Sequence, residues 1–292
     1  MKQKIIKISV IIPAFNEEKA ISQVIDQLKN NFNARLLPYE IIVVNDASTD
    51  GTVEILKKIE DIKIIHHPYN KGYGASLKTG ADYAQYEWLL FFDSDGQHRA
   101  EDIDKFIENS DNFDMIVGAR QGYQGPILRQ PGKKLLHWIA NYLSEHKIPD
   151  LNSGFRLVKK SIFIKYRHIL PDGFSLSTTS TIAFFKEGYN IKYVPICINK
   201  RIGKSSLKLS DGLGTLMLTL RLIMLFSPLK IFLPISLAGF IISMGWAVYD
   251  LITNHFQSIS KTSGFIFVAT LLIFLFGLLA DQIAAIRREI KK

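Results

Sequence analysis

The stretch Leu89-Leu90-Phe91-Phe92-Asp93-Ser94-Asp95-Gly96-Gln97-His98 joins an apolar strand to two carboxylates that one residue separates. Side chains alternate along a strand, so Asp93 and Asp95 are expected to point the same way where the strand ends, and Gly96 permits a turn beside them. Two carboxylates suit one Mg²⁺ or Mn²⁺, which completes its shell with water and substrate phosphate. The stretch therefore predicts a metal site that faces a diphosphate.

Two other interpretations of this stretch stay open from its residues alone. An Asp-x-Asp-Gly segment is also a common turn ahead of a helix. Phe92–Gly96 further resembles the nucleophile loop of haloacid-dehalogenase-like phosphatases, whose motif usually continues with Thr or Val and lies on the first strand of the domain. Here Gln97 follows, and three strand-like segments come earlier in the chain. Both features weigh against the phosphatase alternative.

Strands and helices alternate before this stretch. The predicted strands are the aliphatic runs Ile8–Ile12, Glu40–Val44 and Lys63–His66. Helices are expected from Glu17, with Asn16 as its N-cap, and over Val53–Ile59. This alternation favours a Rossmann-like α/β fold with a mostly parallel sheet covered on both faces. Ligands of such sheets lie at the carboxyl ends of the strands, where Asn16, Asp46 and the Asp93/Asp95 pair fall.

Two long uncharged segments lie near the end of the chain. Ile231–Tyr249 has 19 residues without charge, which a helix would extend over ~28 Å, close to the hydrocarbon thickness of a bilayer. Phe265–Ala280 is a shorter uncharged run, and a span over it can extend through Ile283. Leu213–Phe226 is apolar but broken by polar residues and closed by Pro228, which predicts an interfacial helix. We expect a transmembrane hairpin; a buried hairpin of a soluble protein is the alternative.

Basic residues surround the apolar segments. Residues 200–292 carry eleven Lys or Arg residues against four Asp or Glu residues, so this part holds +7 of the net charge of +9. Lys200–Lys230 and Arg287–Lys292 are basic, whereas Asp250–Ser263 holds one Lys, so both ends are predicted to face the cytoplasm. This distribution indicates anionic lipid or a lipid phosphate as the partner, and it argues against nucleic acid. The single cysteine, Cys197, fits a reducing compartment.

The order of four motifs resembles the family 2 glycosyltransferases with the GT-A fold. Within that family it is similar to the branch of dolichyl-phosphate mannose synthase and the bacterial polyprenyl-phosphate glucosyltransferases. The motifs are Ile12-Pro13-Ala14-Phe15-Asn16-Glu17, Val44-Asn45-Asp46-Ala47-Ser48-Thr49-Asp50-Gly51-Thr52, Asn70-Lys71-Gly72 and Asp93-Ser94-Asp95-Gly96-Gln97-His98. The resemblance covers about residues 5–205. Family members with four spans or none leave the oligomeric state open, and a homo-oligomer is possible.

The resemblance implies roles for individual residues. The nucleotide-sugar pocket would be lined by Pro13, Ala14, Asn16, Glu17, Asp46, Lys71 and Asp93, with Asp46 contacting the base. Mg²⁺ or Mn²⁺ would be held by Asp93, Asp95 and Gln97. The acceptor phosphate would be bound by Arg120, Arg129, Ser153, Arg201 and Lys204, in line with the bidentate grip of guanidinium on phosphate. The candidate catalytic residues are Asp95, Arg120, Arg129 and Arg201. His66 and His67 lack partners at metal-ligand spacing, so no metal is assigned to them.

Together these patterns predict a GT-A catalytic domain at residues 1–206, an interfacial amphipathic region at 207–230 and two transmembrane helices with a basic cytoplasmic tail at 231–292. The expected function is metal-dependent, inverting transfer of a hexose from a GDP-mannose or UDP-glucose type donor to a dolichyl or undecaprenyl type polyprenyl phosphate. The expected location is the cytoplasmic (inner or plasma) membrane, as a multi-pass protein with its catalytic domain in the cytoplasm. A catalytically idle, membrane-tethered nucleotide-sugar-binding protein is the alternative from another class.

A missing carboxylate favours a phosphate acceptor. Enzymes of this family that glycosylate hydroxyls generally place an Asp or Glu near the acceptor as general base. The corresponding helix start here is Phe174–Thr181, with no carboxylate before Glu187, and Asp172 is the nearest fallback. A phosphate monoester needs no base, because its second pKa of about 6 leaves it mostly a dianion at neutral pH.

Overall fold

A seven-stranded mixed sheet forms the centre of the first of two compact units, residues 1–212 and 213–292. The computed structural model describes residues 6–121, 137–142, 144–200, 202, 221, 224–253 and 260–289. Residues 288 and 289 are described by their backbone only. The strand order is β3-β2-β1-β4-β6-β5-β7, and only β6 runs antiparallel to its neighbours. The strands are β1 (Ile8–Ala14), β2 (Tyr39–Asn45), β3 (Lys63–His66), β4 (Trp88–Phe91), β5 (Met115–Arg120), β6 (Arg156–Lys159) and β7 (Ile191–Ile196).

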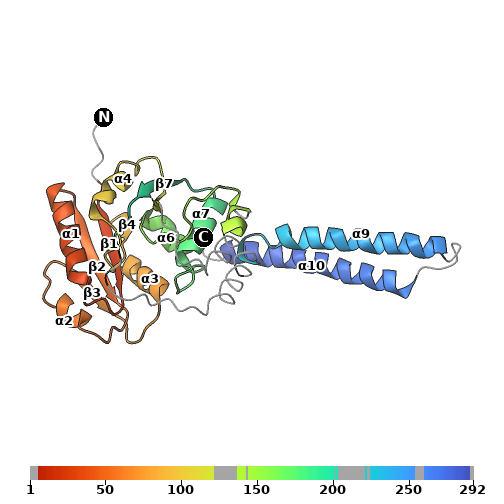
Figure 1. Ribbon diagram of the computed structural model, residues 1–292, viewed down its shortest axis with the longest axis horizontal. Coiled ribbons are helices and arrows are strands. Elements are labelled where there is room, and N and C mark those ends of the chain that lie inside the picture. Colours follow the sequence, from red (N-terminus) through yellow and green to blue (C-terminus); the bar gives the residue numbers. More distant parts are fainter. Residues whose placement is uncertain are drawn as a thin grey trace. The chain divides into compact units, whose positions relative to one another are not determined.

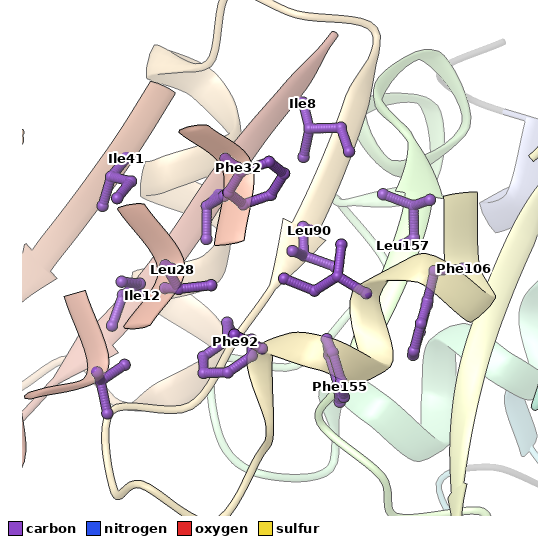
Figure 2. Packing of buried hydrophobic residues seen from close by; sticks show 14 of the residues in the cluster. Ile8, Ile12, Leu28, Phe32, Ile41, Leu90, Phe92, Phe106, Phe155 and Leu157 are labelled. Carbon is purple, nitrogen blue, oxygen red and sulfur yellow. The ribbon is translucent and has the colours of Figure 1, made fainter. Parts of the chain in front are cut away.

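Helices cover both faces of this sheet (Figure 1). The α-helices described in the first unit are α1 (Ile21–Ala34), α2 (Thr52–Leu56), α3 (Tyr73–Tyr83), α4 (Ile103–Ile107), α6 (Lys160–Tyr166) and α7 (Leu176–Lys186), and a 3₁₀ turn spans Ala100–Asp102. Figure 2 shows Leu28 and Phe32 of α1 gathered with Leu90 of β4 in the core on one face, which also receives Phe106 of α4. On the other face Phe91 packs edge-on against Phe163 of α6, with 5.0 Å between ring centroids.

The mostly parallel α/β sheet predicted from the sequence is confirmed, and two local expectations were wrong. Asn16 does not cap α1, which begins at Ile21 after a turn and has Ala20 at its N-cap position. Asn16 instead adopts a left-handed conformation (φ 57°) and bonds to the loop after β2. The prediction also missed β6 and β7. The strand β6 begins at the buried Arg156, and β7 contains Lys192 and Pro195, so neither has the pattern of an uninterrupted apolar run.

The second unit contains two long antiparallel helices, α9 (Leu229–Thr253) and α10 (Lys261–Glu289), which lie side by side (Figure 1). Both are long and apolar enough to cross a membrane. They include the predicted spans 231–249 and 265–283. Only residues 221 and 224–226 of the predicted interfacial helix 213–226 are described, and they are helical; the rest of it lies outside the described residues.

Candidate active site

The carboxyl ends of β1, β2 and β4 meet at one edge of the sheet because these strands are parallel neighbours. Backbone and side-chain bonds join the segments that follow them. The amide of Asp46 donates to the carbonyl oxygen of Ala14 (2.8 Å). The hydroxyl of Ser94 donates to the carbonyl oxygen of Pro13 (2.8 Å). These bonds place Asp46, after β2, and the Asp93–Asp95 segment, after β4, on either side of the end of β1.

The segment after β1 is interlocked with the loop after β2. The side-chain oxygen of Asn16 accepts the amide of Thr49 (2.7 Å), and the amide of Asn16 donates to Ser48 Oγ (3.0 Å). The amide of Glu17 donates to Thr52 Oγ1 (2.9 Å). Both Pro13 and Ala14 are buried, whereas Asn16 is exposed and Glu17 is half-buried. The expected nucleotide contacts of this segment stay a prediction, and its described bonds give it a fixed shape.

The Asp46 carboxylate is buried and organises a neighbouring loop. Its Oδ1 accepts the amide of Lys71 (2.8 Å) and the Nδ1–H of His67 (2.7 Å), and its Oδ2 accepts the amide of Gly72 (2.8 Å). His67 Nε2 in turn lies 2.9 Å from Thr79 Oγ1. The side chain of Lys71 is exposed. Asp46 therefore holds the Asn70-Lys71-Gly72 motif at the site, and its expected contact with the base stays a prediction.

Asp93 lies at the centre of the site with a donor on each oxygen. Tyr73 donates its hydroxyl hydrogen to Oδ1 (2.9 Å), and His98 Nε2 lies 3.1 Å from Oδ2. Burial alone raises the pKa of Asp93. The hydrogen bond and positive field of His98, the hydrogen bond of Tyr73 and the positive charge of Arg120 outweigh burial, so the net pKa lies below its usual value. The same burial, together with Asp93 itself, raises the pKa of Tyr73 well above its usual value, which keeps the phenol a donor.

Asp95 and Gln97 continue the motif into a tight turn. The Asp95 carboxylate is buried and accepts the amide of Gln97 (3.0 Å), and Gly96 adopts a left-handed φ of 72° between them. The backbone oxygen of Asp95 accepts the amide of Ile202 (3.0 Å), so the segment after β7 is tied to this turn. The turn that the residues alone left as an alternative is present, and the expected metal-binding role of the two carboxylates stays a prediction.

The donor set at this edge fits a hard divalent cation. Asp93, Asp95 and Gln97 offer carboxylate and amide oxygens, the ligand type that Mg²⁺ and Mn²⁺ prefer. Among the residues that the structure describes, no three His, Cys, Asp or Glu side chains are grouped to hold a metal by themselves. The expected cation site, completed by oxygens of a bound diphosphate, stays a prediction.

Arg120 is held beside the site by an acidic partner. Its Nε and Nη2 donate to the two oxygens of Asp150, at 2.7 and 2.9 Å. Burial alone raises the pKa of Asp150, but the bonds and charge of Arg120 outweigh burial and lower it. Three other residues expected at the acceptor phosphate, Arg129, Arg201 and Lys204, lie outside the described residues.

The loop before β6 lies against Asp93, and hydrogen bonds from the buried Arg156 hold it in place. A Cβ atom on Gly154 would lie 2.8 Å from Asp93 Oδ2, so a larger residue there would displace the Asp93 side chain. Arg156 is fully buried and donates to the backbone oxygens of Ser153 (2.7 Å) and Leu151 (3.3 Å). Ser153 is also fully buried, and its Oγ has no hydrogen-bond partner within the described part of the chain. Its expected contact with the acceptor phosphate stays a prediction.

The hydroxyl-rich start of α7 bonds to protein groups. Arg156 Nη1 donates to Ser180 Oγ (3.1 Å) and Thr181 Oγ1 (2.8 Å), and Thr178 donates to the side-chain oxygen of Asn152 (2.9 Å). The fallback base, Asp172, is an exposed carboxylate paired with Lys78 at 2.8 Å. These contacts show that the hydroxyl-rich segment is engaged in packing and hydrogen bonding within the protein.

Sequence reasoning missed several residues that shape this site. Tyr73, Asp150 and Arg156 belong to motifs or loops that received no role, and His98 was quoted in the acidic motif without a function. Of these residues, only the contact of His98 could have been suspected from the sequence. An imidazole three residues after an Asp-x-Asp pair is close enough in the chain to contact one of its carboxylates. The other contacts join residues far apart in the chain, such as Tyr73 and Asp93, which the sequence does not pair.

Two family models match this chain. A model described as glycosyl transferase family 2 matches residues 9–167, more than half of the chain, and one described as the GtrB C-terminal hairpin matches residues 227–286. The first match covers β1 to α6 and includes every described motif residue discussed above except those on α7. It removes the haloacid-dehalogenase-like alternative.

Relatives and solved structures agree with the family models. The UDP-N-acetylglucosamine–dolichyl-phosphate N-acetylglucosaminyltransferase of Methanococcus voltae is 31% identical over 218 residues, covering 65% of this chain and 84% of that protein. A dolichyl-phosphate beta-glucosyltransferase of Trichomonas vaginalis is 28% identical over 169 residues, 51% of this chain and 52% of that protein. The glucosyl-3-phosphoglycerate synthase of Mycobacterium tuberculosis, solved with Mn²⁺, UDP and phosphoglyceric acid, shares the fold with a TM-score of 0.60 at 20% identity, covering 75% of this chain and 78% of that one.

Proposed function

Since the chain belongs to glycosyl transferase family 2, we propose that it transfers a hexose from a nucleotide-diphosphate sugar to a polyprenyl phosphate. The observation that carries this proposal is the convergence of Asp46 and the Asp93–Asp95 motif at one sheet edge, with Arg120 close enough to lower the pKa of Asp93. Acidic oxygens suit a cation and diphosphate, and a guanidinium suits an acceptor phosphate. The match to dolichyl-phosphate transferases supports the lipid acceptor.

On this proposal the donor lies across the ends of β1, β2 and β4. Pro13, Ala14, Asn16 and Glu17 line the nucleotide from one side, and Lys71 approaches it from the loop that Asp46 holds. Asp93, Asp95 and Gln97 hold Mg²⁺ or Mn²⁺ against the diphosphate. The cation, when bound, neutralises the charge that develops on the leaving diphosphate. Glucosyl-3-phosphoglycerate synthase has been solved with Mn²⁺ or Mg²⁺ together with UDP, which supports the use of a divalent cation with this fold.

The acceptor phosphate supplies its own nucleophile in this reaction. A phosphate dianion attacks the anomeric carbon in line with the leaving diphosphate, which inverts the configuration at that carbon. Positioning is the main task left to the protein, and we assign it to Arg120, Arg129, Arg201 and Lys204. The described start of α7 offers no carboxylate, and Asp172 faces Lys78 instead. Both observations support an acceptor that needs no general base.

Transfer assays with a matrix of donors and acceptors test this proposal. Purified full-length protein in detergent is given UDP-glucose, UDP-N-acetylglucosamine or GDP-mannose with undecaprenyl phosphate or free undecaprenol, with Mn²⁺ or with EDTA. We expect transfer to the phosphate acceptor only, and only with the cation. Transfer to undecaprenol at a comparable rate would contradict the phosphate acceptor, and the absence of transfer from all donors would favour the idle binding protein.

The acidic motif gives the first mutational prediction. Replacing Asp95 by Asn keeps the size of the side chain but removes a charged oxygen ligand, so transfer should fall by several orders of magnitude. Asp172→Asn serves as the matched control, because this exposed carboxylate is assigned no catalytic role and should leave turnover nearly unchanged. Full activity of Asp95→Asn in EDTA, or loss of turnover in Asp172→Asn alone, would show that the roles are assigned wrongly.

A further inference from the structure

We infer that His98 and Tyr73 are positioning residues that clamp the Asp93 carboxylate, one donor on each oxygen, in the orientation in which it binds the cation and diphosphate. This inference rests on the proposed function and adds two residues to its site. Neither residue needs to touch the substrate. Their contribution is to fix the plane of a side chain that does.

His98 presents one directed donor to Asp93. The imidazole is only 4% exposed, and Nε2 lies 3.1 Å from Asp93 Oδ2. An ionised carboxylate only accepts hydrogen bonds, so Nε2 must carry the hydrogen. The ring packs against Phe92 and Phe155, with centroids at 5.7 and 4.9 Å, and these two rings also contact each other; Nδ1 has no partner among the described residues. These two aromatic contacts and the hydrogen bond to Asp93 together restrict the orientation of the ring.

Tyr73, the first residue of α3, holds the other oxygen of Asp93. Its hydroxyl donates to Asp93 Oδ1 at 2.9 Å. Its ring is stacked on Phe174, with 5.3 Å between centroids and 17° between the planes. Gly154 lies close to the phenol, because a Cβ atom there would be 2.7 Å from the Tyr73 hydroxyl oxygen. The phenol is therefore fixed by packing as well as by its hydrogen bond.

The clamp determines which part of the carboxylate remains for a ligand. A carboxylate has about four acceptor positions on its two oxygens, and the described residues use one on each oxygen of Asp93. Rotation about the bond to the carboxylate would break both hydrogen bonds. The orientation is thus set before the substrate arrives. Partners of this kind that orient a metal ligand commonly contribute tenfold or more to metal affinity.

Binding of Mn²⁺ to the full-length protein measures the clamp directly. Free Mn²⁺ is followed by electron paramagnetic resonance, in the presence of UDP and separately of GDP, for wild type and variants. His98→Phe keeps an aromatic ring against Phe92 and Phe155 but removes the donor, and we expect the Mn²⁺ dissociation constant to rise about tenfold. Tyr73→Phe keeps the stack on Phe174 and should weaken Mn²⁺ binding similarly. His98→Gln restores a donor of similar reach, so it should recover most of the affinity.

Controls separate the clamp from a purely structural role. His146→Phe alters another histidine that stacks on an aromatic ring, Phe185, and it should leave Mn²⁺ binding unchanged. Thermal melting identifies any variant that fails to fold. If His98→Phe does not fold, Tyr73→Phe carries the test alone.

The outcomes distinguish this inference from the proposed function. Wild-type Mn²⁺ affinity in folded His98→Phe and Tyr73→Phe would overturn the inference and leave the function intact. Sugar transfer by a wild-type protein that binds no Mn²⁺ would overturn it as well. A wild type that neither binds Mn²⁺ with either nucleotide nor transfers sugar would contradict the proposed function itself.

Discussion

The Arg120–Asp150 pair shows how a single residue near the site is both placed and stabilised. Both side chains are mostly buried, with 23% and 13% of their surfaces exposed, and two parallel hydrogen bonds join them. Asp150→Asn leaves the mostly buried guanidinium of Arg120 without its charged partner. We expect the free energy of unfolding to fall by about 1–3 kcal/mol, measured by chemical or thermal denaturation in detergent.

This contribution depends on pH with a defined sign. The folded-state pKa of Asp150 lies below its usual value, so the stabilisation is present above the unfolded-state pKa of about 4 and is lost as the pH falls through the lower, folded-state pKa. The stability difference between wild type and Asp150→Asn should therefore be full at neutral pH and shrink in acid. Asp172→Asn, which breaks an exposed pair, should change stability by less than about 1 kcal/mol at any pH. Equal effects of the two variants would contradict this prediction.

At the scale of residues, the sequence predicted which side chains lie at the strand ends better than it predicted the contacts that hold them. Asp93 and Asp95 were identifiable as two carboxylates directly after an apolar strand, but β4 ends at Phe91 and Asp95 lies in a turn, so strand alternation does not set their directions. Asp46 was placed correctly at a strand end, but its three donors come from His67 and the 70–72 loop. Such partners depend on how separate loops pack together, which no local pattern specifies.

At the scale of elements, strong repeating patterns were reliable and short irregular ones were not. The parallel strands β1 and β2 are continuous aliphatic runs, and both were predicted. The strand β6 has four residues and contains the buried Arg156, so its pattern does not resemble an apolar strand. The left-handed Asn16 was mistaken for a helix cap because both roles use the same short amide side chain.

The α9–α10 hairpin shows close packing through small residues. Ser263, Thr270, Gly277 and Ala284 recur every seven residues along α10, and all are buried. A Cβ atom on Gly277 would lie 2.5 Å from Phe232 Cβ, and one on Gly239 would lie 2.5 Å from Thr270 Oγ1. Close approach through small side chains is the usual basis of helix association in membranes.

Enlarging one of these glycines should separate the two helices. Gly277→Leu forces side-chain atoms into the space of Phe232, and overpacking of this kind costs about 1–3 kcal/mol. Gly245→Leu is the matched control, because it makes the same change on α9 where no atom lies within 4 Å. Thermal melting in detergent, combined with disulfide crosslinking between paired cysteines on α9 and α10, measures both. A melting temperature for Gly277→Leu equal to that of Gly245→Leu would contradict the described packing.

At the scale of the whole molecule, one chain combines a soluble-type catalytic unit with two helices apolar enough to span a membrane. A polyprenyl phosphate has its reactive group at the membrane surface and its tail in the bilayer. A membrane-anchored transferase keeps its catalytic unit near that surface, so a lipid acceptor and a hairpin in the same chain are mutually consistent. The charge asymmetry around the hairpin then predicts on which side the transfer occurs.

The native cysteine makes this orientation testable within a single protein. Cys197 lies in the catalytic unit and is exposed, and Lys261, the first residue of α10, is exposed at the opposite end of the hairpin from the basic flanks. If the two basic flanks of the hairpin face the cytoplasm, a membrane-impermeant maleimide should label Lys261→Cys in intact cells and reach Cys197 only after lysis. Lys261→Cys combined with Cys197→Ser assigns each signal to its residue. Labelling of Cys197 in intact cells while position 261 stays protected would reverse the orientation, and it would place sugar transfer on the outer face, where nucleotide sugars made in the cytoplasm are not supplied.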